Sequence, residues 1–91
     1  MTWLVYILRC ADGTHYTGVT TDLPRRLGAH ETGRGARYTR GRGPFVVVHV
    51  EAADGRGAAL RREAEIKRLP PERKPGVARA RAKARRARNR R

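Results

Sequence analysis

The chain has 91 residues, which is enough for one small domain with a modest core and too few for a second domain. Its formal net charge of +14 comes from 22 Lys and Arg against 8 Asp and Glu, and such a positive field favours polyanionic partners, nucleic acid before membrane. The single cysteine, Cys10, excludes an internal disulfide framework and a zinc site built on paired cysteines.

Two strands and a turn are predicted at the N-terminus. Residues 3–8 are apolar on both faces, which is typical of a central strand covered on both sides. This stretch is too short to span a bilayer and no basic residue precedes it, so we expect a cytoplasmic, nucleoid-associated protein without a signal peptide. Asp12-Gly13 then marks a hairpin turn, and residues 15–20 form the returning strand.

A helix is predicted from Asp22, where the spacing of apolar residues changes to a helical period. Asp22 is a good N-cap, Pro24 is tolerated in the first helical turn, and Gly33 ends the helix. One stripe of the helical wheel carries two leucines and two polar side chains: Leu23, Arg26, Leu27 and His30.

The segment 33–43 has no periodicity, and a loop of this length in so small a domain is usually functional or disordered. Its arginines lie among glycines and one tyrosine, so the loop can follow a phosphate backbone and stack on an exposed base; a solvated turn is the alternative. The residues expected to contact nucleic acid are Arg34, Arg37, Tyr38, Arg40 and Arg42.

A third strand and a second helix complete the predicted elements. Residues 45–50 are rich in β-branched side chains and are expected to pair with the hairpin. After a turn at 54–57, residues 58–69 form a helix that Pro70-Pro71 ends. The order of elements is therefore β-β-α-β-α.

The positive charge is concentrated at the C-terminus. Residues 1–71 carry 12 Lys and Arg against 7 Asp and Glu (+5), whereas residues 72–91 carry 10 against 1 (+9). From residue 76 onward alanine alternates with Arg or Lys, without an apolar stripe for docking on the domain or on lipid. We expect a folded domain over 1–71, a flexible basic arm over 72–91 that binds nucleic acid, and no membrane contact.

Several of these residues together carry a resemblance to a known family. The chain resembles the GIY-YIG endonuclease superfamily, and most closely its small stand-alone bacterial branch, which is similar to the N-terminal nuclease domain of the bacterial repair excinuclease. The resemblance covers residues 3–69 and departs from the family name at Leu4, Val5 and Thr17. The residues that carry it are Leu4-Val5-Tyr6, Tyr16-Thr17-Gly18, Arg26, His30 and Glu63.

The resemblance implies an α+β fold, with a small, mainly antiparallel three-stranded sheet flanked by helices. It also implies hydrolysis of a phosphodiester assisted by one divalent cation, Mg²⁺ or Mn²⁺. By resemblance, Tyr16 matches the general-base tyrosine of the family and Tyr6 matches its second active-site tyrosine. Arg26 matches the arginine that binds the scissile phosphate, His30 matches a polar residue of the site, and Glu63 matches the metal ligand.

Helical periodicity gives independent support for Glu63. On the wheel it falls in the inward stripe with Ala59 and Ile66, whereas Glu65 falls beside the arginines. An inward carboxylate needs a partner, and a hard cation completed by waters and phosphate is one candidate. An i,i+4 ion pair with Lys67, worth ~0.2–0.5 kcal/mol, is the other, and the sequence favours neither.

Two physical conditions apply to the tyrosines. A phenol has a pKa of ~10, so Tyr16 as a base needs about 4 kcal/mol of stabilisation from Arg26 or a cation. Otherwise Tyr16 only orients a metal-bound water. A two-residue hairpin loop would send Tyr6 to the opposite face from Tyr16, so a shared site requires an odd-length loop, such as three residues with Gly13 left-handed, or a bulge.

We therefore predict a divalent-metal-dependent endonuclease that hydrolyses DNA, branched or damaged DNA included, in repair or recombination. The alternative is a non-catalytic module that uses the same fold and the basic arm to bind DNA or structured RNA. A third possibility is a polypeptide whose activity needs a partner protein. The oligomeric state is left open, and a monomer is compatible with the sequence.

Overall fold

The computed structural model describes residues 1–77, which form a three-stranded antiparallel sheet with strand order β2-β1-β3. The strands are β1 (Trp3–Arg9), β2 (His15–Thr20) and β3 (Val46–Ala53). The helices are α1 (Leu23–Glu31) and α2 (Arg56–Arg68), with short 3₁₀ turns η1 (Arg37–Thr39) and η2 (Pro71–Arg73). The α+β class and the β-β-α-β-α order are thus confirmed.

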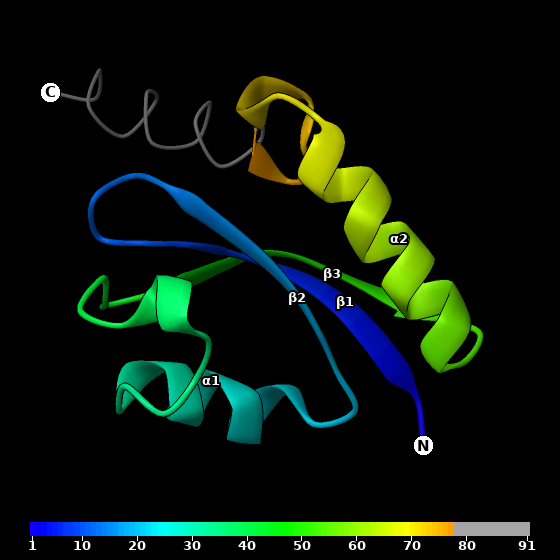
Figure 1. Ribbon diagram of the computed structural model, residues 1–91, viewed down its shortest axis with the longest axis horizontal. Coiled ribbons are helices and arrows are strands. Elements are labelled where there is room, and N and C mark those ends of the chain that lie inside the picture. The colour runs from blue at the N-terminus through cyan, green and yellow to red at the C-terminus, as the bar shows by residue number, and fades with distance from the viewer. Residues whose placement is uncertain (78–91) are drawn as a thin grey trace, which may run out of the picture.

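The central strand β1 is covered on both faces, as its continuous apolar run predicts. All four side chains from Val5 to Leu8 are fully buried. Val5 and Ile7 face α2 and pack with Ala59 and Ile66 of that helix. Tyr6 and Leu8 face the other way, where Leu23 and Leu27 of α1 and Phe45 cover them. The two helices therefore lie on opposite sides of the sheet (Figure 1).

The β1–β2 hairpin has the odd-length loop that a shared tyrosine site requires. Cys10 pairs with Thr14 through a 2.8 Å backbone hydrogen bond, which leaves three loop residues between them. Gly13 takes a left-handed φ of 85°, a conformation that glycine adopts at little cost. Leu8 consequently lies opposite Tyr16, and Tyr6 lies opposite Gly18. Both tyrosines point to the same face of the sheet.

Both helices begin and end where local chemistry allows. The Asp22 side chain accepts a hydrogen bond from Arg25 N and caps α1. α2 begins at Arg56, two residues earlier than predicted, because Gly55 has a φ of 93° and turns the chain directly into the helix.

β3 extends three residues further than predicted because Ala52 and Ala53 pair with β1.

The packed part of the chain continues past α2 to Val77. Val77 is fully buried in the cluster on the α2 side of the sheet, and Lys74 donates a 2.7 Å hydrogen bond to the carbonyl of Ile66 near the end of α2. A Cβ at Gly76 would collide with the Val48 carbonyl, so only glycine permits this approach to β3. Packing thus reaches six residues beyond the expected boundary at residue 71. Of the flexible arm expected over 72–91, residues 72–77 belong to the described part of the chain, and residues 78–91 lie outside it.

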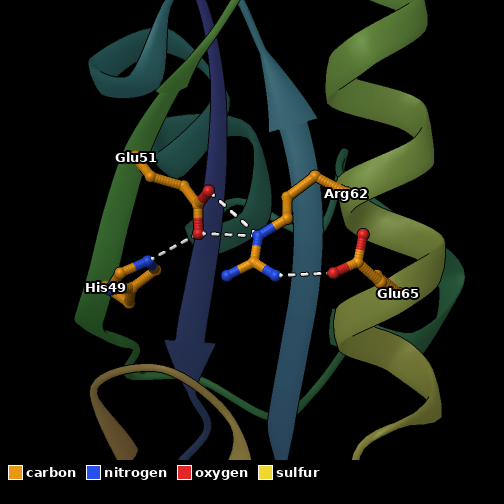
Figure 2. A network of polar contacts seen from close by, with 4 residues as sticks. All are labelled: His49, Glu51, Arg62 and Glu65. Atoms are coloured by element: carbon orange, nitrogen blue, oxygen red, sulfur yellow. Dashed lines mark hydrogen bonds and ion pairs between the residues drawn. The ribbon is translucent and has the colours of Figure 1, made fainter.

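A polar network ties α2 to β3 across the sheet (Figure 2). Arg62 of α2 donates from Nε to both carboxylate oxygens of Glu51, at 3.1 and 3.0 Å, and from a terminal nitrogen to Glu65 at 3.0 Å. His49 lies 2.9 Å from Glu51 as well. Within residues 1–77 no helix is long and apolar enough to cross a membrane.

Candidate active site

The candidate site is centred on Tyr6 and Tyr16, which lie side by side on the α1 face of the sheet with ring centroids 6.3 Å apart. Tyr6 lies across Gly18 of the neighbouring strand. A Cβ at Gly18 would stand 2.6 Å from the Tyr6 hydroxyl oxygen and 2.9 Å from the Tyr16 ring. Gly18 therefore leaves the space in which the two tyrosines meet.

Tyr6 is fully buried and its hydroxyl lies 2.8 Å from Nε2 of His30. Burial, with a smaller contribution from the neighbouring Tyr16, raises the pKa of Tyr6 to about 12, although a hydrogen bond from Arg26 acts in the opposite direction. Tyr6 is thus held as a neutral phenol at physiological pH. Its hydroxyl is a hydrogen-bonding group of the site.

His30 comes from the last turn of α1 and is 1% exposed. Its second nitrogen, Nδ1, lies 2.8 Å from the hydroxyl of Thr39, which belongs to η1. Burial and the nearby Arg26 guanidinium lower the pKa of His30, so the ring is neutral at pH 7. The predicted inward stripe of α1 is confirmed for His30, Leu23 and Leu27.

Arg26 is one helical turn before His30 and lies beside both tyrosines. Hydrogen bonding to Tyr6, and more weakly to Tyr16, raises the pKa of Arg26 above its usual value. The guanidinium therefore stays charged next to the more accessible Tyr16, which is only partly buried. This pairing places a fixed positive charge and a phenol hydroxyl at one point of the surface.

Glu63 of α2 approaches the site from the opposite helix. It is near enough to Tyr6 to contribute to the raised pKa of that phenol. Its side chain is 20% exposed, against 66% for Glu65, so the predicted inward position of Glu63 is confirmed. Lys67 lies 3.6 Å from a Glu63 oxygen and 5.9 Å from the centre of the Tyr16 ring. The predicted i,i+4 pair is therefore present.

A divalent cation at this place would be held by one protein carboxylate. Among residues 1–77 no three His, Cys, Asp or Glu side chains converge as a metal cluster. One carboxylate, with waters and substrate phosphate completing the shell, suits Mg²⁺, which keeps much of its hydration. Glu63 fits that role provided that Lys67 moves aside.

The arginine-rich loop, residues 33–43, lies over Tyr16. The Tyr38 ring stacks on Tyr16 with centroids 6.1 Å apart, and the Arg42 guanidinium lies 4.4 Å from the centre of the Tyr38 ring. Arg42 also pairs with Asp12 of the hairpin loop at 2.5 Å. Tyr38 thus contacts Tyr16 directly while it remains 42% exposed. The other three arginines of the loop, Arg34, Arg37 and Arg40, lie at its surface.

The sequence predicts no role for two residues of this loop that the structure brings to the site. Thr39 is 1% exposed and bonds His30, and Gly35 packs so closely on the His30 ring that a Cβ there would collide with Nδ1. Neither residue type is unusual in a loop, and their partner lies several positions earlier in α1. Ala36 and Tyr38 also stand among the Arg and Gly residues of this segment, so no local signal marks Thr39.

A small α+β domain with paired tyrosines, an arginine and a histidine on one sheet face and a glutamate beside them has the architecture of a GIY-YIG nuclease domain. The chain belongs to the GIY-YIG family, since the family model described as the GIY-YIG catalytic domain matches residues 2–74. Membership implies nuclease activity and a nucleic acid substrate in general terms, and nucleases of this family generally use a divalent metal.

Relatives of similar size support this assignment. The chain is 57% identical over 72 residues to a UPF0213 protein of Nitratidesulfovibrio vulgaris, a match that spans 79% of this chain and 66% of that protein, just under two thirds. It is 52% identical over 65 residues to UPF0213 protein VNG_2274C of Halobacterium salinarum, covering 71% of this chain and 84% of that protein.

Solved structures resemble the chain in the same way. The solution NMR structure of UPF0213 protein BH0048 from Bacillus halodurans has 50% identity and a TM-score of 0.51, covering 81% of this chain and 79% of that one. The solution NMR structure of protein EF2693 from E. faecalis has 39% identity and a TM-score of 0.55, covering 77% and 75%. The three-stranded GIY-YIG fold is therefore shown by the structure and by relatives alike.

Proposed function

We propose that this protein is a divalent-metal-dependent endonuclease that hydrolyses DNA phosphodiester bonds in DNA repair or recombination. The observation that supports the proposal most is that Arg26 of α1 lies beside Tyr16 of β2, while Lys67, the ion-pair partner of Glu63 in α2, lies 5.9 Å from the centre of the same Tyr16 ring. Tyr16, Arg26 and Glu63 each supply a chemistry that phosphodiester hydrolysis needs: orientation of water, neutralisation of phosphate charge and attachment of a cation.

In this proposal a water oxygen attacks phosphorus and the bond to one ester oxygen breaks. Arg26 donates two parallel hydrogen bonds to the phosphate and stabilises the charge that grows on its oxygens. Tyr16, partly exposed beside Arg26, contacts the attacking water and orients or deprotonates it. Tyr6 stays a neutral phenol that is hydrogen-bonded with His30 and lies next to Arg26. A cation bound by Glu63 would act as a Lewis acid on the phosphate and leaving oxygen.

The surface arginines of the loop and the basic residues from 78 onward would supply sequence-independent contacts to the phosphate backbone. Contacts of this kind position the duplex and do not read its sequence. These contacts therefore give affinity without base specificity.

A second candidate function is favoured by the ion pair between Glu63 and Lys67. With the ammonium already beside the carboxylate, the same fold can bind DNA or RNA without cutting it. Binding without cleavage, weakened by salt and unchanged by Glu63→Ala, would support this candidate.

The test is a nicking assay on supercoiled plasmid and on branched duplexes with Mg²⁺ or Mn²⁺. Tyr16→Phe, Arg26→Ala and Glu63→Ala are each expected to lower the rate by about 100-fold or more. Arg25→Ala and Glu65→Ala are matched controls, because both side chains are exposed neighbours of the altered residues. Variants at Tyr16, Arg26 and Glu63 that cut as fast as the parent would refute the assignment.

A further inference from the structure

Three buried side chains form a continuous hydrogen-bonded chain behind the candidate site. The Tyr6 hydroxyl lies 2.8 Å from Nε2 of His30, and Nδ1 of His30 lies 2.8 Å from Oγ1 of Thr39. Thr39 in turn lies 2.8 Å from the carbonyl oxygen of Ala36. Each of the three side chains is at most 1% exposed, so bulk water does not compete for these bonds.

The direction of each bond follows from the inventory of donors. A carbonyl oxygen only accepts, so the single hydroxyl proton of Thr39 points to Ala36. Oγ1 then has only lone pairs for His30, so Nδ1 must carry a proton. In a neutral imidazole Nε2 is then the acceptor, and the Tyr6 hydroxyl donates to it.

The loop also fixes the orientation of the ring. Gly35 packs against Nδ1, so the ring cannot swing toward the loop. The rings of Tyr16 and Phe45 lie edge-on to His30, at centroid distances of 5.1 and 6.1 Å. The same ring is thus held from the loop, from β2 and from the residue that precedes β3.

We propose that Thr39 is a positioning residue that selects the Nδ1–H tautomer of His30 and thereby fixes the direction of the Tyr6 hydroxyl. With its proton committed to His30, the Tyr6 oxygen leaves its lone pairs for the guanidinium of Arg26, the side chain that lies beside it. Donation therefore runs from Tyr6 to His30, from His30 to Thr39 and from Thr39 to the carbonyl oxygen of Ala36, which only accepts. Through Thr39, the arginine-rich loop therefore sets the direction of the Tyr6 hydroxyl that lies beside the Arg26 guanidinium.

The effect of Thr39 on DNA cleavage rests on the proposed nuclease function. The effect of Thr39 on the His30 tautomer is independent of that function. If Thr39 is lost, Nδ1 is no longer required to carry the proton, and an Nε2–H group of His30 then competes with Arg26 for the lone pairs of the Tyr6 oxygen. A guanidinium that loses its acceptor is held less firmly, and phosphate binding and cleavage weaken together. A hydroxyl at position 39, and not the threonine methyl, is the feature that matters.

The test pairs Thr39→Val, which keeps the shape and removes the hydroxyl, with Thr39→Ser, which keeps the hydroxyl. Long-range ¹H–¹⁵N NMR spectra of the full chain labelled at histidine nitrogens report the tautomer of His30 directly. We expect Nδ1–H in the parent and in Thr39→Ser, and a shift toward Nε2–H in Thr39→Val. Nicking is expected to fall about tenfold in Thr39→Val and to stay near the parent rate in Thr39→Ser.

Either of two results would overturn the proposal: an Nε2–H tautomer of His30 in the parent, or an unchanged tautomer in a folded Thr39→Val. The parent spectrum alone decides the first, so a variant that fails to fold does not leave the question open. If the parent shows Nδ1–H but does not nick DNA, the positioning role stands and the nuclease function fails. A normal rate in Thr39→Val with a switched tautomer would refute the link to cleavage.

Discussion

At the scale of single residues, Gly18 is the position on which the geometry of the site depends most directly. A Cβ there would stand 2.6 Å from the Tyr6 oxygen, so Gly18→Ala must push the phenol away from His30. We expect a loss of about 1–3 kcal/mol in the free energy of unfolding, measured by denaturant titration. Gly28→Ala is the matched control: nothing lies within 4 Å of its Cβ, and in α1 it should stabilise by ~0.5–1 kcal/mol. Equal effects of the two substitutions would contradict the crowding at Gly18.

His30 makes a second residue-scale prediction, which concerns pH. Its pKa is lowered from the ordinary value of 6.5, so below that pH the unfolded chain binds a proton that the folded protein does not. The contribution of neutral His30 to the free energy of unfolding is therefore fully present above pH 6.5. It is lost as the pH falls through 6.5 toward the lower pKa that His30 has in the folded protein. An NMR titration of the His30 ring should give a midpoint below 6.5, and His30→Gln should flatten the fall in unfolding free energy over this range. A midpoint above 6.5 would show that the ring gains rather than loses affinity for protons on folding.

A third prediction at this scale concerns Lys67, and it rests on the proposed metal site at Glu63. An ammonium 3.6 Å from Glu63 competes with a divalent cation for the carboxylate, at a cost of at least ~1 kcal/mol in water. Lys67→Gln should therefore strengthen Mn²⁺ binding by about fivefold or more, measured by calorimetric titration. Arg68→Gln removes the same charge from an exposed neighbouring position, so it controls for the overall field. Identical gains in both variants would mean that the ion pair itself does not compete.

At the scale of secondary structure elements, the sequence was sufficient wherever the cause is local. The cap at Asp22, the left-handed Gly13 in the hairpin and the inward side of α2 all follow from residues within about two helical turns of each other along the chain, and all are confirmed. What escaped prediction depends on distant partners. The bond from His30 to Thr39 spans nine positions, the bond from Tyr6 to His30 spans 24, and the end of β3 is set by pairing with β1. Periodicity carries no information about such pairs.

The attachment of α2 to the sheet gives the element-scale prediction. Glu51 accepts hydrogen bonds from Arg62 and His49, and although burial alone would raise its pKa, these bonds hold the pKa below its usual value (Figure 2). Glu51→Gln keeps the shape and removes the charge, and should cost about 1–2 kcal/mol of unfolding free energy. Glu65→Gln, whose side chain is 66% exposed, should change it by less than ~0.5 kcal/mol. Comparable losses in both variants would show that the network is not centred on Glu51.

At the scale of the whole molecule, stability and charge reside in different parts of the chain. Residues 1–77 carry 14 Lys and Arg against 8 Asp and Glu (+6), and residues 78–91 carry eight basic residues and no acidic one (+8). Val77 closes the core beside α2, and Lys74 bonds the end of that helix. A boundary drawn by charge at residue 71 therefore divides a packed unit, whereas a boundary after Val77 does not.

Two truncations separate these contributions. Ending the chain after Val77 should leave the unfolding free energy within ~0.5 kcal/mol of the parent, since no buried residue of the described part is removed. Ending it after residue 71 should cost about 2–4 kcal/mol, because the buried Val77 and the Lys74 bond are both lost. In DNA binding, removal of residues 78–91 alone should reduce the slope of log affinity against log salt by about 0.9 for each lost phosphate contact. Fluorescence anisotropy with a labelled duplex at several salt concentrations measures that slope, and an unchanged slope would mean that the basic residues after Val77 do not contact DNA.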